Sequence, residues 1–163
     1  MALTPTQQQA LAAHIATVPE WAALPKDSDS AVIIAAGLNQ TAAPAFIVWR
    51  TRVSQDEIMQ NGFDWVRVDN LSVGKARIWD WLFSNSVRAI NPSKANVRAG
   101  IAECWKGTAA DLAVQAAVLA HCKREATIVE RVLATGTGSD AAPATMSFEG
   151  SIGYADVQAA RGE

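Results

Sequence analysis

The sequence is poor in the side chains that most often carry chemistry, because its 163 residues include two cysteines and two histidines. Two cysteines are too few for a disulfide scaffold, and Cys104 and Cys122 are too far apart for a CxxC metal site. We expect both to be buried free thiols, which pack as small hydrophobic side chains. On a helix, the neighbours His121 and Cys122 would point about 100° apart rather than toward one ion. We therefore expect no metal and no cofactor, and His14 is expected to be an ordinary packed or exposed residue.

The sequence also lacks an excess of positive charge and a long apolar run. Its formal net charge of −2 gives the whole molecule no electropositive field for nucleic acid, which leaves only a local basic patch for that role. The longest apolar run, 31–38, is far shorter than the roughly 20 residues that span a bilayer. The first residues do not resemble a signal peptide. We expect a cytosolic protein with no membrane partner, unless a particle carries it out of the cell.

Length and composition favour one domain built from closely packed helices. The chain is long enough for one continuous core and too short for two independent domains of typical size. Half of its residues are hydrophobic but only 7% are aromatic, and much of the apolar content is alanine. Much of the large buried area must therefore come from the tryptophans, which are Trp21, Trp49, Trp65, Trp79, Trp81 and Trp105.

Two helix starts and one strand are readable in the first half of the chain. Thr4 and Pro5 combine an N-cap hydroxyl with a proline at the first helical position, which predicts a helix to about residue 17. Ser54 and Glu57 have the spacing of a capping box, which predicts a second helix there. The run 44–52 is rich in β-branched and aromatic residues after a proline, which is typical of a strand and equally fits an extended segment under helices.

A long helix is predicted over 108–134. Its apolar residues recur every three or four positions and form one unbroken stripe. Within 112–120 the only polar residue is Gln115, so this half of the helix is apolar on all sides. A helix that is apolar all round is normally buried all round. We expect this half to be central in the fold or pressed against another subunit, with Val114 and Val118 as candidate contacts.

The residues after the long helix are predicted to form an extended arm. Gly136, Gly138 and Gly150 are candidate hinges because glycine adopts backbone angles that other residues avoid. Side chains that alternate around Gly150 predict a short β-hairpin. The candidate partner contacts in this arm are Met146, Phe148, Ile152 and Tyr154. The predicted fold is mainly α: a single domain with a helical bundle over 1–135, which contains the long helix, and a Gly-hinged arm over 136–163.

Apolar residues at helical spacing predict a further helix over 72–83, with two tryptophans of different roles. Trp79 lies on the apolar stripe, and we expect it in the core. Trp81 lies two residues further on, outside the stripe, and a partner interface is about as well supported for it as core packing. Basic residues interleaved with these rings would suit single-stranded nucleic acid, and they are Arg67, Lys75, Arg77 and Arg88. A small nucleic-acid-binding regulator is therefore an alternative hypothesis.

Motifs for catalysis are weak throughout the chain. The run Gly136-x-Gly138-x-x-Ala141 formally matches a relaxed dinucleotide fingerprint, but it follows a helix where that motif requires a strand. Scattered acids could converge on a divalent metal, as in a metal-dependent nuclease, but their spacing favours solvated surface residues. The acids in question are Asp56, Glu57, Asp64, Asp69 and Asp80. We expect the protein not to be an enzyme.

Several segments resemble a family of small tailed-bacteriophage proteins whose genes tend to lie near the major capsid gene. The resemblance is carried by Asn39 with 44–51 (PAFIVWRT), by 123–131 (KREATIVER), 134–138 (ATGTG) and 143–150 (PATMSFEG), and by the similar start 3–8 (LTPTQQ). These are family-signature residues without a catalytic role.

The resemblance implies a structural virion protein, the head-tail connector or adaptor of the phage neck. Such a protein binds the portal protein, meets stopper or tail proteins below it, and forms a homo-oligomeric ring, here of about twelve copies. DNA would pass through the lumen without sequence-specific contact, and the arm would reach a neighbouring subunit. A phage assembly factor outside the virion is the nearest alternative.

Overall fold

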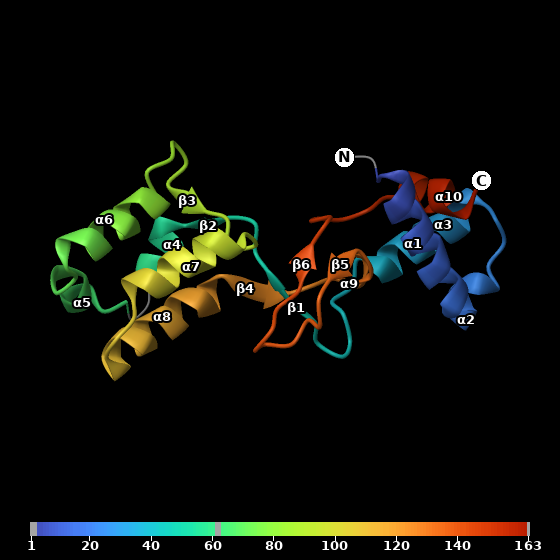
Figure 1. The fold of residues 1–163 in the computed structure, drawn as a ribbon. Helices are drawn as coiled ribbons and strands as arrows, with labels where there is room; N and C mark the ends of the chain where they lie inside the picture. Colours follow the sequence, from blue (N-terminus) through green and yellow to red (C-terminus); the bar gives the residue numbers. More distant parts are fainter. Residues whose placement is uncertain (1–2, 61–62, 163) are drawn as a thin grey trace. The chain divides into compact units, whose positions relative to one another are not determined.

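The structure is a computed structural model that describes residues 3–60 and 63–162, and it is mainly helical (Figure 1). The mainly α fold class is thus confirmed. The described residues divide into two compact units. Unit 1 contains the chain up to Val48 and again from Glu125, and unit 2 contains the residues between, Trp49–Arg124. Gly136, where the sequence predicted the body to give way to an arm, lies inside unit 1.

Unit 1 is built from helices of both chain ends. Its elements are α1 (Pro5–Thr17), α2 (Pro19–Ala22), α3 (Ser28–Leu38), α9 (Ile128–Val132), β5 (Ala134–Thr135), β6 (Thr145–Met146) and α10 (Tyr154–Arg161). The predicted start of α1 is confirmed, because Thr4 and Gln7 form a reciprocal capping box ahead of Pro5. α10 packs against α1 and α3, and α9 contacts both. The shared core is aliphatic, and its most buried members are Leu11, Ala31, Ile34, Leu38, Val129 and Val157.

The segment predicted as an extended arm is packed onto unit 1 of its own chain. β6 pairs antiparallel with β5, and Ala144, Ile152 and Val157 are buried. The Asn39 side chain holds both backbone groups of Ile152: its Nδ2 donates to the Ile152 carbonyl (2.9 Å), and its Oδ1 accepts from the Ile152 N–H (3.0 Å). The buried Glu130 carboxylate accepts from the Gly150 N–H (3.0 Å). The apolar residues of this C-terminal segment belong to the core clusters of unit 1, which is why the segment packs there and does not extend into solvent.

Two predicted hinge glycines occupy constrained positions in the loop after β5. Gly136 has φ +125° and Gly138 has φ +67°, both in the region that favours glycine. The Phe46 ring packs directly on Gly138, where a Cβ would come within 2.2 Å of it. The third candidate hinge, Gly150, also has a positive φ of +122° and has open space around its α-carbon. In this structure, Gly136 and Gly138 are places of close packing.

Unit 2 has an aromatic core. Its elements are β2 (Val53–Ser54), α4 (Gln55–Met59), α5 (Trp65–Asp69), α6 (Val73–Leu82), β3 (Ala89–Ile90), α7 (Ala95–Cys104) and α8 (Ala109–His121). Trp79 packs against Trp105 and Phe83 with ring centroids 5.4 and 5.1 Å apart, and α7 contacts both α6 and α8. β2 pairs antiparallel with β3, and the predicted capping box of Ser54 and Glu57 starts α4. The predicted core position of Trp79 is confirmed.

The long helix predicted over 108–134 is broken into three elements. α8 ends at His121, the strand β4 (Lys123–Glu125) follows, and α9 begins after Thr127. β4 pairs with β1 (Ile47–Trp49), the strand predicted within 44–52. Thr127 and Glu130 form a capping box, which starts a new helix in place of continuing the old one. The unbroken apolar stripe concealed this local signal.

Candidate interaction surfaces

The structure brings together no recognisable catalytic or metal centre in the part of the chain that it describes. Among those residues, no three His, Cys, Asp or Glu side chains lie close enough to hold a metal ion. Cys104 and Cys122 are buried free thiols, as predicted. Burial raises their pKa values to about 11 and about 12, so both are protonated and unreactive at neutral pH. No described helix combines the length and apolarity needed to cross a membrane.

The residues predicted as partner contacts are divided between core and surface. Val114 and Val118 are buried in the unit 2 core, and Ile152 is buried in unit 1. Met146 and Phe148 are half-buried against unit 1 clusters. Two of the predicted contacts are exposed at the surface: Trp81, with 67% of its area accessible, and Tyr154, with 52%.

Most of the basic residues considered for nucleic-acid binding are engaged within unit 2. Arg67 forms an ion pair with Asp111 at 2.9 Å. The Lys75 ammonium donates to the Lys106 carbonyl at 2.9 Å, and the Arg88 guanidinium donates to Gln55 Oε1 at 2.7 Å. These contacts hold the three side chains against unit 2 and use part of their hydrogen-bonding capacity. Arg77 differs, since its exposed side chain has no hydrogen bond or ion pair within the described residues.

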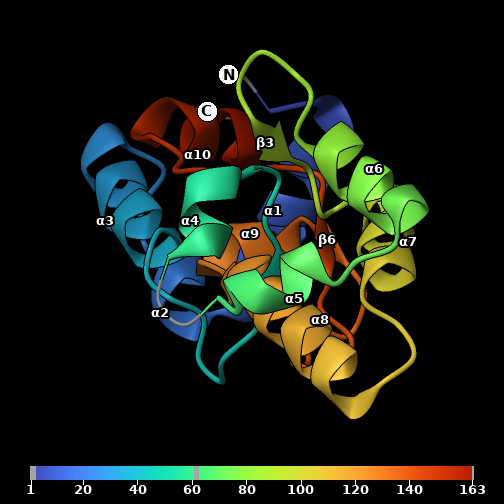
Figure 2. The same cartoon turned by 90° about the vertical axis from the view of Figure 1, so that its left-hand side faces the viewer.

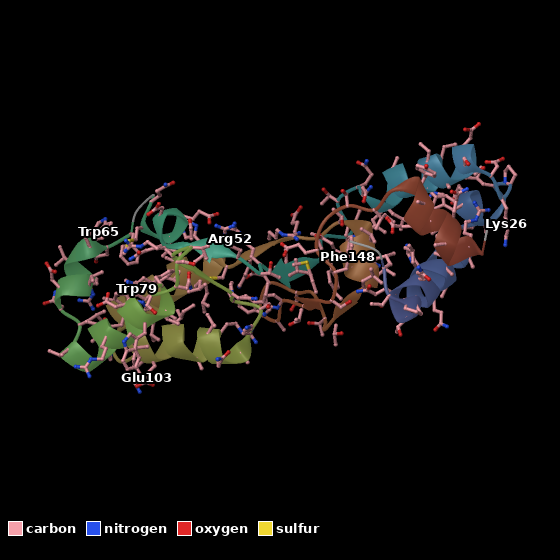
Figure 3. The ribbon with its side chains drawn as sticks, turned by 90° about the horizontal axis from the view of Figure 1, so that it is seen from above. Lys26, Arg52, Trp65, Trp79, Glu103 and Phe148 are labelled. Carbon is pink, nitrogen blue, oxygen red and sulfur yellow. The ribbon has the colours of Figure 1, made fainter. Side chains whose placement is uncertain are left out.

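An exposed row of side chains runs along α6. Val73, Arg77 and Trp81 are spaced by four residues, so they lie on one helix face, and all three are exposed. We call this row the α6 ridge. Trp79 is buried in the core. Trp81 follows two residues later, which is a rotation of about 200° around the helix, and its side chain is therefore on the opposite, exposed face. In Figure 3, Trp79 lies among the helices of unit 2, whereas the exposed Trp65 lies at the edge of that unit.

An open groove of about 590 Å³ runs beside the α6 ridge. Its apolar walls come from α5, from the turn that follows it and from the ridge itself, and they include Val68 and Leu71. Asp69 and Asp80 bring two carboxylates to the groove, but Arg77 forms no ion pair with either of them within the described residues. The ridge therefore presents a large apolar side chain and a guanidinium without an ion pair among the described residues to solvent.

A second surface lies on α8, which is apolar on its outer face as well as on its inner one. The inner face contributes Val114 and Val118 to the core. The outer face is exposed and carries no charge, and its residues are Leu112, Ala113, Ala116, Ala117 and Ala120. We call these five residues the α8 face. Figure 2 looks onto α5, α6 and α8 of unit 2. Of the two placements predicted for this apolar half-helix, a fully central one is wrong, because one side is open to solvent.

A small pocket of about 220 Å³ adjoins the α8 face, and we call it the α8 pocket. It is mostly apolar, and it is lined by Phe63, Asp64, Ala110, Ala113, Val114 and Ala117. Asp64 is the N-cap of α5, yet its carboxylate accepts no capping hydrogen bond and forms no ion pair among the described residues. Sequence reasoning missed this pocket, because only the fold brings Asp64 beside α8.

No family model, no curated protein and no solved structure matches this chain. Among the described residues, large exposed hydrophobic side chains are more numerous on unit 2 than on unit 1.

Proposed function

We propose that the protein is a non-enzymatic assembly protein of a tailed-bacteriophage virion, acting as a head-tail connector in the neck. It would form a ring below the portal, meet stopper or tail proteins on the other side, and let DNA pass through its lumen. The signature segments of the sequence, such as 44–51 and 123–131, support the phage assignment by resemblance. The α8 face supports the assembly role.

The α8 face is the observation that carries this proposal. Soluble monomers rarely leave a continuous apolar surface open, and such surfaces usually mark contacts with other macromolecules. Here five successive outward positions of one helix are alanine or leucine, with no charged residue to keep them solvated. Small side chains also let a second backbone approach closely, which suits a repeated contact between subunits. A ring protein needs such a surface in every copy.

The charge distribution suits a DNA channel better than a DNA-binding site. A net charge of −2 does not attract phosphates strongly, which would let DNA slide through a ring. Arg67, Lys75 and Arg88 are occupied by contacts within unit 2. In this proposal, the helical bundle predicted from the sequence is the body of each subunit. The packed C-terminal segment would contact neighbours through exposed residues such as Tyr154.

Localisation in the virion tests the proposal directly. We expect the protein in purified particles, and cryo-electron microscopy should place a ring of copies between portal and tail. Absence from intact virions would overturn the connector role and favour an assembly factor or a regulator. A DNA mobility-shift assay then separates these two, because a regulator would bind with an affinity that falls steeply as salt rises.

A further inference from the structure

We infer that copies of this chain bind one another head to tail, with Trp81 of one copy inserted into the α8 pocket of the next. The inference deepens the proposed function and rests on it for the identity of the assembly. It concerns unit 2 alone, which carries both the projecting side chain and the pocket.

The two surfaces match in size and polarity. The Trp81 indole projects from α6 with 67% of its area exposed, and the α8 pocket offers about 220 Å³ of mostly apolar space. Three alanines, Ala110, Ala113 and Ala117, leave the room that one large flat side chain needs. Buried aromatic side chains in fitted pockets are the groups that dominate binding energy at protein interfaces.

The charges of the two surfaces are also complementary. Arg77 lies one turn before Trp81 on the α6 ridge, and Asp64 lies on the α8 pocket. Neither side chain has an ion-pair partner within the residues that the structure describes. If the indole enters the pocket, the guanidinium comes near the Asp64 carboxylate, and such a pair forms strong charge-assisted hydrogen bonds. Asp69 and Asp80 line the groove beside the ridge and are not among the residues of the α8 pocket.

The separation of the two surfaces on unit 2 allows a head-to-tail contact. The α6 ridge and the α8 pocket share no residue, and α7 packs against both helices that carry them (Figure 1). One copy can therefore offer its ridge to one neighbour and its pocket to another. When the two surfaces bind different neighbours, the contact is heterologous and produces closed rings or open filaments, and oligomers larger than a dimer distinguish it from a reciprocal two-fold pair.

Two complementary variants test the inference. Trp81→Ala removes the projecting side chain and keeps the pocket, whereas Ala113→Lys blocks the pocket and keeps the side chain. Both positions are exposed, so both variants should fold, which circular dichroism checks. Sedimentation velocity over roughly micromolar to millimolar protein should show wild-type oligomers larger than dimers. Each variant alone should bind itself at least about 30-fold more weakly. An equimolar mixture should form dimers and nothing larger, because one intact contact remains.

Several outcomes overturn the inference. They are a wild-type chain that stays monomeric throughout, oligomers that survive in either variant, and a mixture that forms no dimer. The exposed hydrophobic control Ile33→Ala, on unit 1, should leave the wild-type pattern unchanged. Charge reversal gives a second readout: Asp64→Arg and Arg77→Glu should each weaken self-association, and the double variant should restore it.

The inference and the proposed function fail in distinguishable ways. Oligomers of purified protein that depend on Trp81, together with absence from virions, would sustain the contact and reject the connector role. A ring in the virion that assembles normally with Trp81→Ala would support the connector role and reject the contact through Trp81.

Discussion

The two units of this chain solve the problem of burying apolar surface in different ways. Unit 1 has an aliphatic core and fixes its C-terminal segment through side chains that bind main-chain atoms, as Asn39 does at Ile152. Unit 2 has an aromatic core around Trp79 and Trp105. Large hydrophobic side chains at the described surface are more numerous on unit 2, where they are Trp65, Val66, Val73, Trp81, Val87 and Leu112, than on unit 1, where they are Val32, Ile33 and Tyr154.

This difference indicates a division of roles. A chain that covers its apolar residues with its own terminus gains stability without a partner, whereas one that leaves a tryptophan and an uncharged helix face open gains from association. Unit 1 closes on itself through residues far apart in sequence, and unit 2 leaves Trp81 and the α8 face exposed to solvent. The predictions that follow test this contrast.

Removal of the C-terminal segment should have the largest effect. A chain that ends at Pro143 loses Ala144, Ile152 and Val157 from the buried set, and the loss of Ile152 and Val157 uncovers the core residues of α1 and α3. Losing several core side chains at once costs more than the 2 to 5 kcal/mol typical of one, roughly the whole stability of a small domain. We expect unit 1 to unfold, which far-ultraviolet circular dichroism measures as lost helix.

Unit 2 provides the internal control for this truncation. Its aromatic cluster, with Trp79 and Trp105, contains no residue from the deleted segment. Near-ultraviolet circular dichroism should therefore keep most of its tryptophan signal. Retention of full helicity by the truncated chain would contradict the self-covering role of the segment and support a detachable arm.

Truncation of the central tryptophan should have the next largest effect, confined to unit 2. Trp79→Ala should lower the free energy of unfolding by about 3 to 5 kcal/mol, because it leaves a cavity among packed rings. Denaturant unfolding followed by tryptophan fluorescence measures this loss. The Trp79 indole N–H is buried without an acceptor in the described part of the chain, so Trp79→Phe should cost much less. Equal losses in both variants would show that ring packing is not what holds unit 2 together.

The clamp in unit 1 should contribute a smaller and local effect. Asn39→Ala removes both hydrogen bonds to Ile152 and leaves its backbone groups without these partners, at a cost of about 1 to 3 kcal/mol. Hydrogen exchange should accelerate in residues 150–157. Gln40→Ala, which removes a hydrogen bond to Ala36 on the exposed side of α3, serves as the matched change and should leave that exchange unaltered. Unchanged exchange in Asn39→Ala would mean that α10 packing alone fixes the segment.

Local signals in the sequence were sufficient for much of the helical fold. Thr4 with Gln7 and Ser54 with Glu57 start helices where their spacing predicts them. Capping is a contact between residues three apart, so it depends little on the rest of the fold. The periodicity of 72–83 likewise separated the buried Trp79 from its neighbour Trp81, because helical rotation is fixed.

Contacts between distant residues were not readable in the same way. Asn39 meets Ile152 across 113 positions, and the sequence alone offers no register for such a pair. The C-terminal segment was therefore predicted as an arm, although its glycines and alternating apolar residues equally suit a packed cover. The α8 pocket was missed for the same reason, since Asp64 and Ala113 come together only in the folded unit. Thr127 was overlooked because the apolar stripe continues through it.

The smallest predicted effect is a pH dependence of the stability of unit 2 that arises from Glu57. Hydrogen bonds from Ser54 and from the Arg50 guanidinium lower the pKa of Glu57 from 4.5 to about 2, so the folded state favours its ionised form. This stabilisation is present above pH 4.5 and is lost as the pH falls toward 2. Because 43% of the side chain is exposed, solvent screening leaves only about 1 kcal/mol.

The variant Glu57→Gln tests the direction of this pH dependence in unit 2, and Asn39→Ala in unit 1 provides a comparison without an ionisable group. Urea unfolding at pH 7 should show wild type more stable than Glu57→Gln by about 1 kcal/mol, and the difference should shrink by pH 3. The loss caused by Asn39→Ala should not change over the same range, since its hydrogen bonds to Ile152 involve no ionisable group. A Glu57→Gln difference that stays constant with pH would show that the side chain acts through its shape and neutral hydrogen bonds, and the capping charge would then contribute nothing to unit 2.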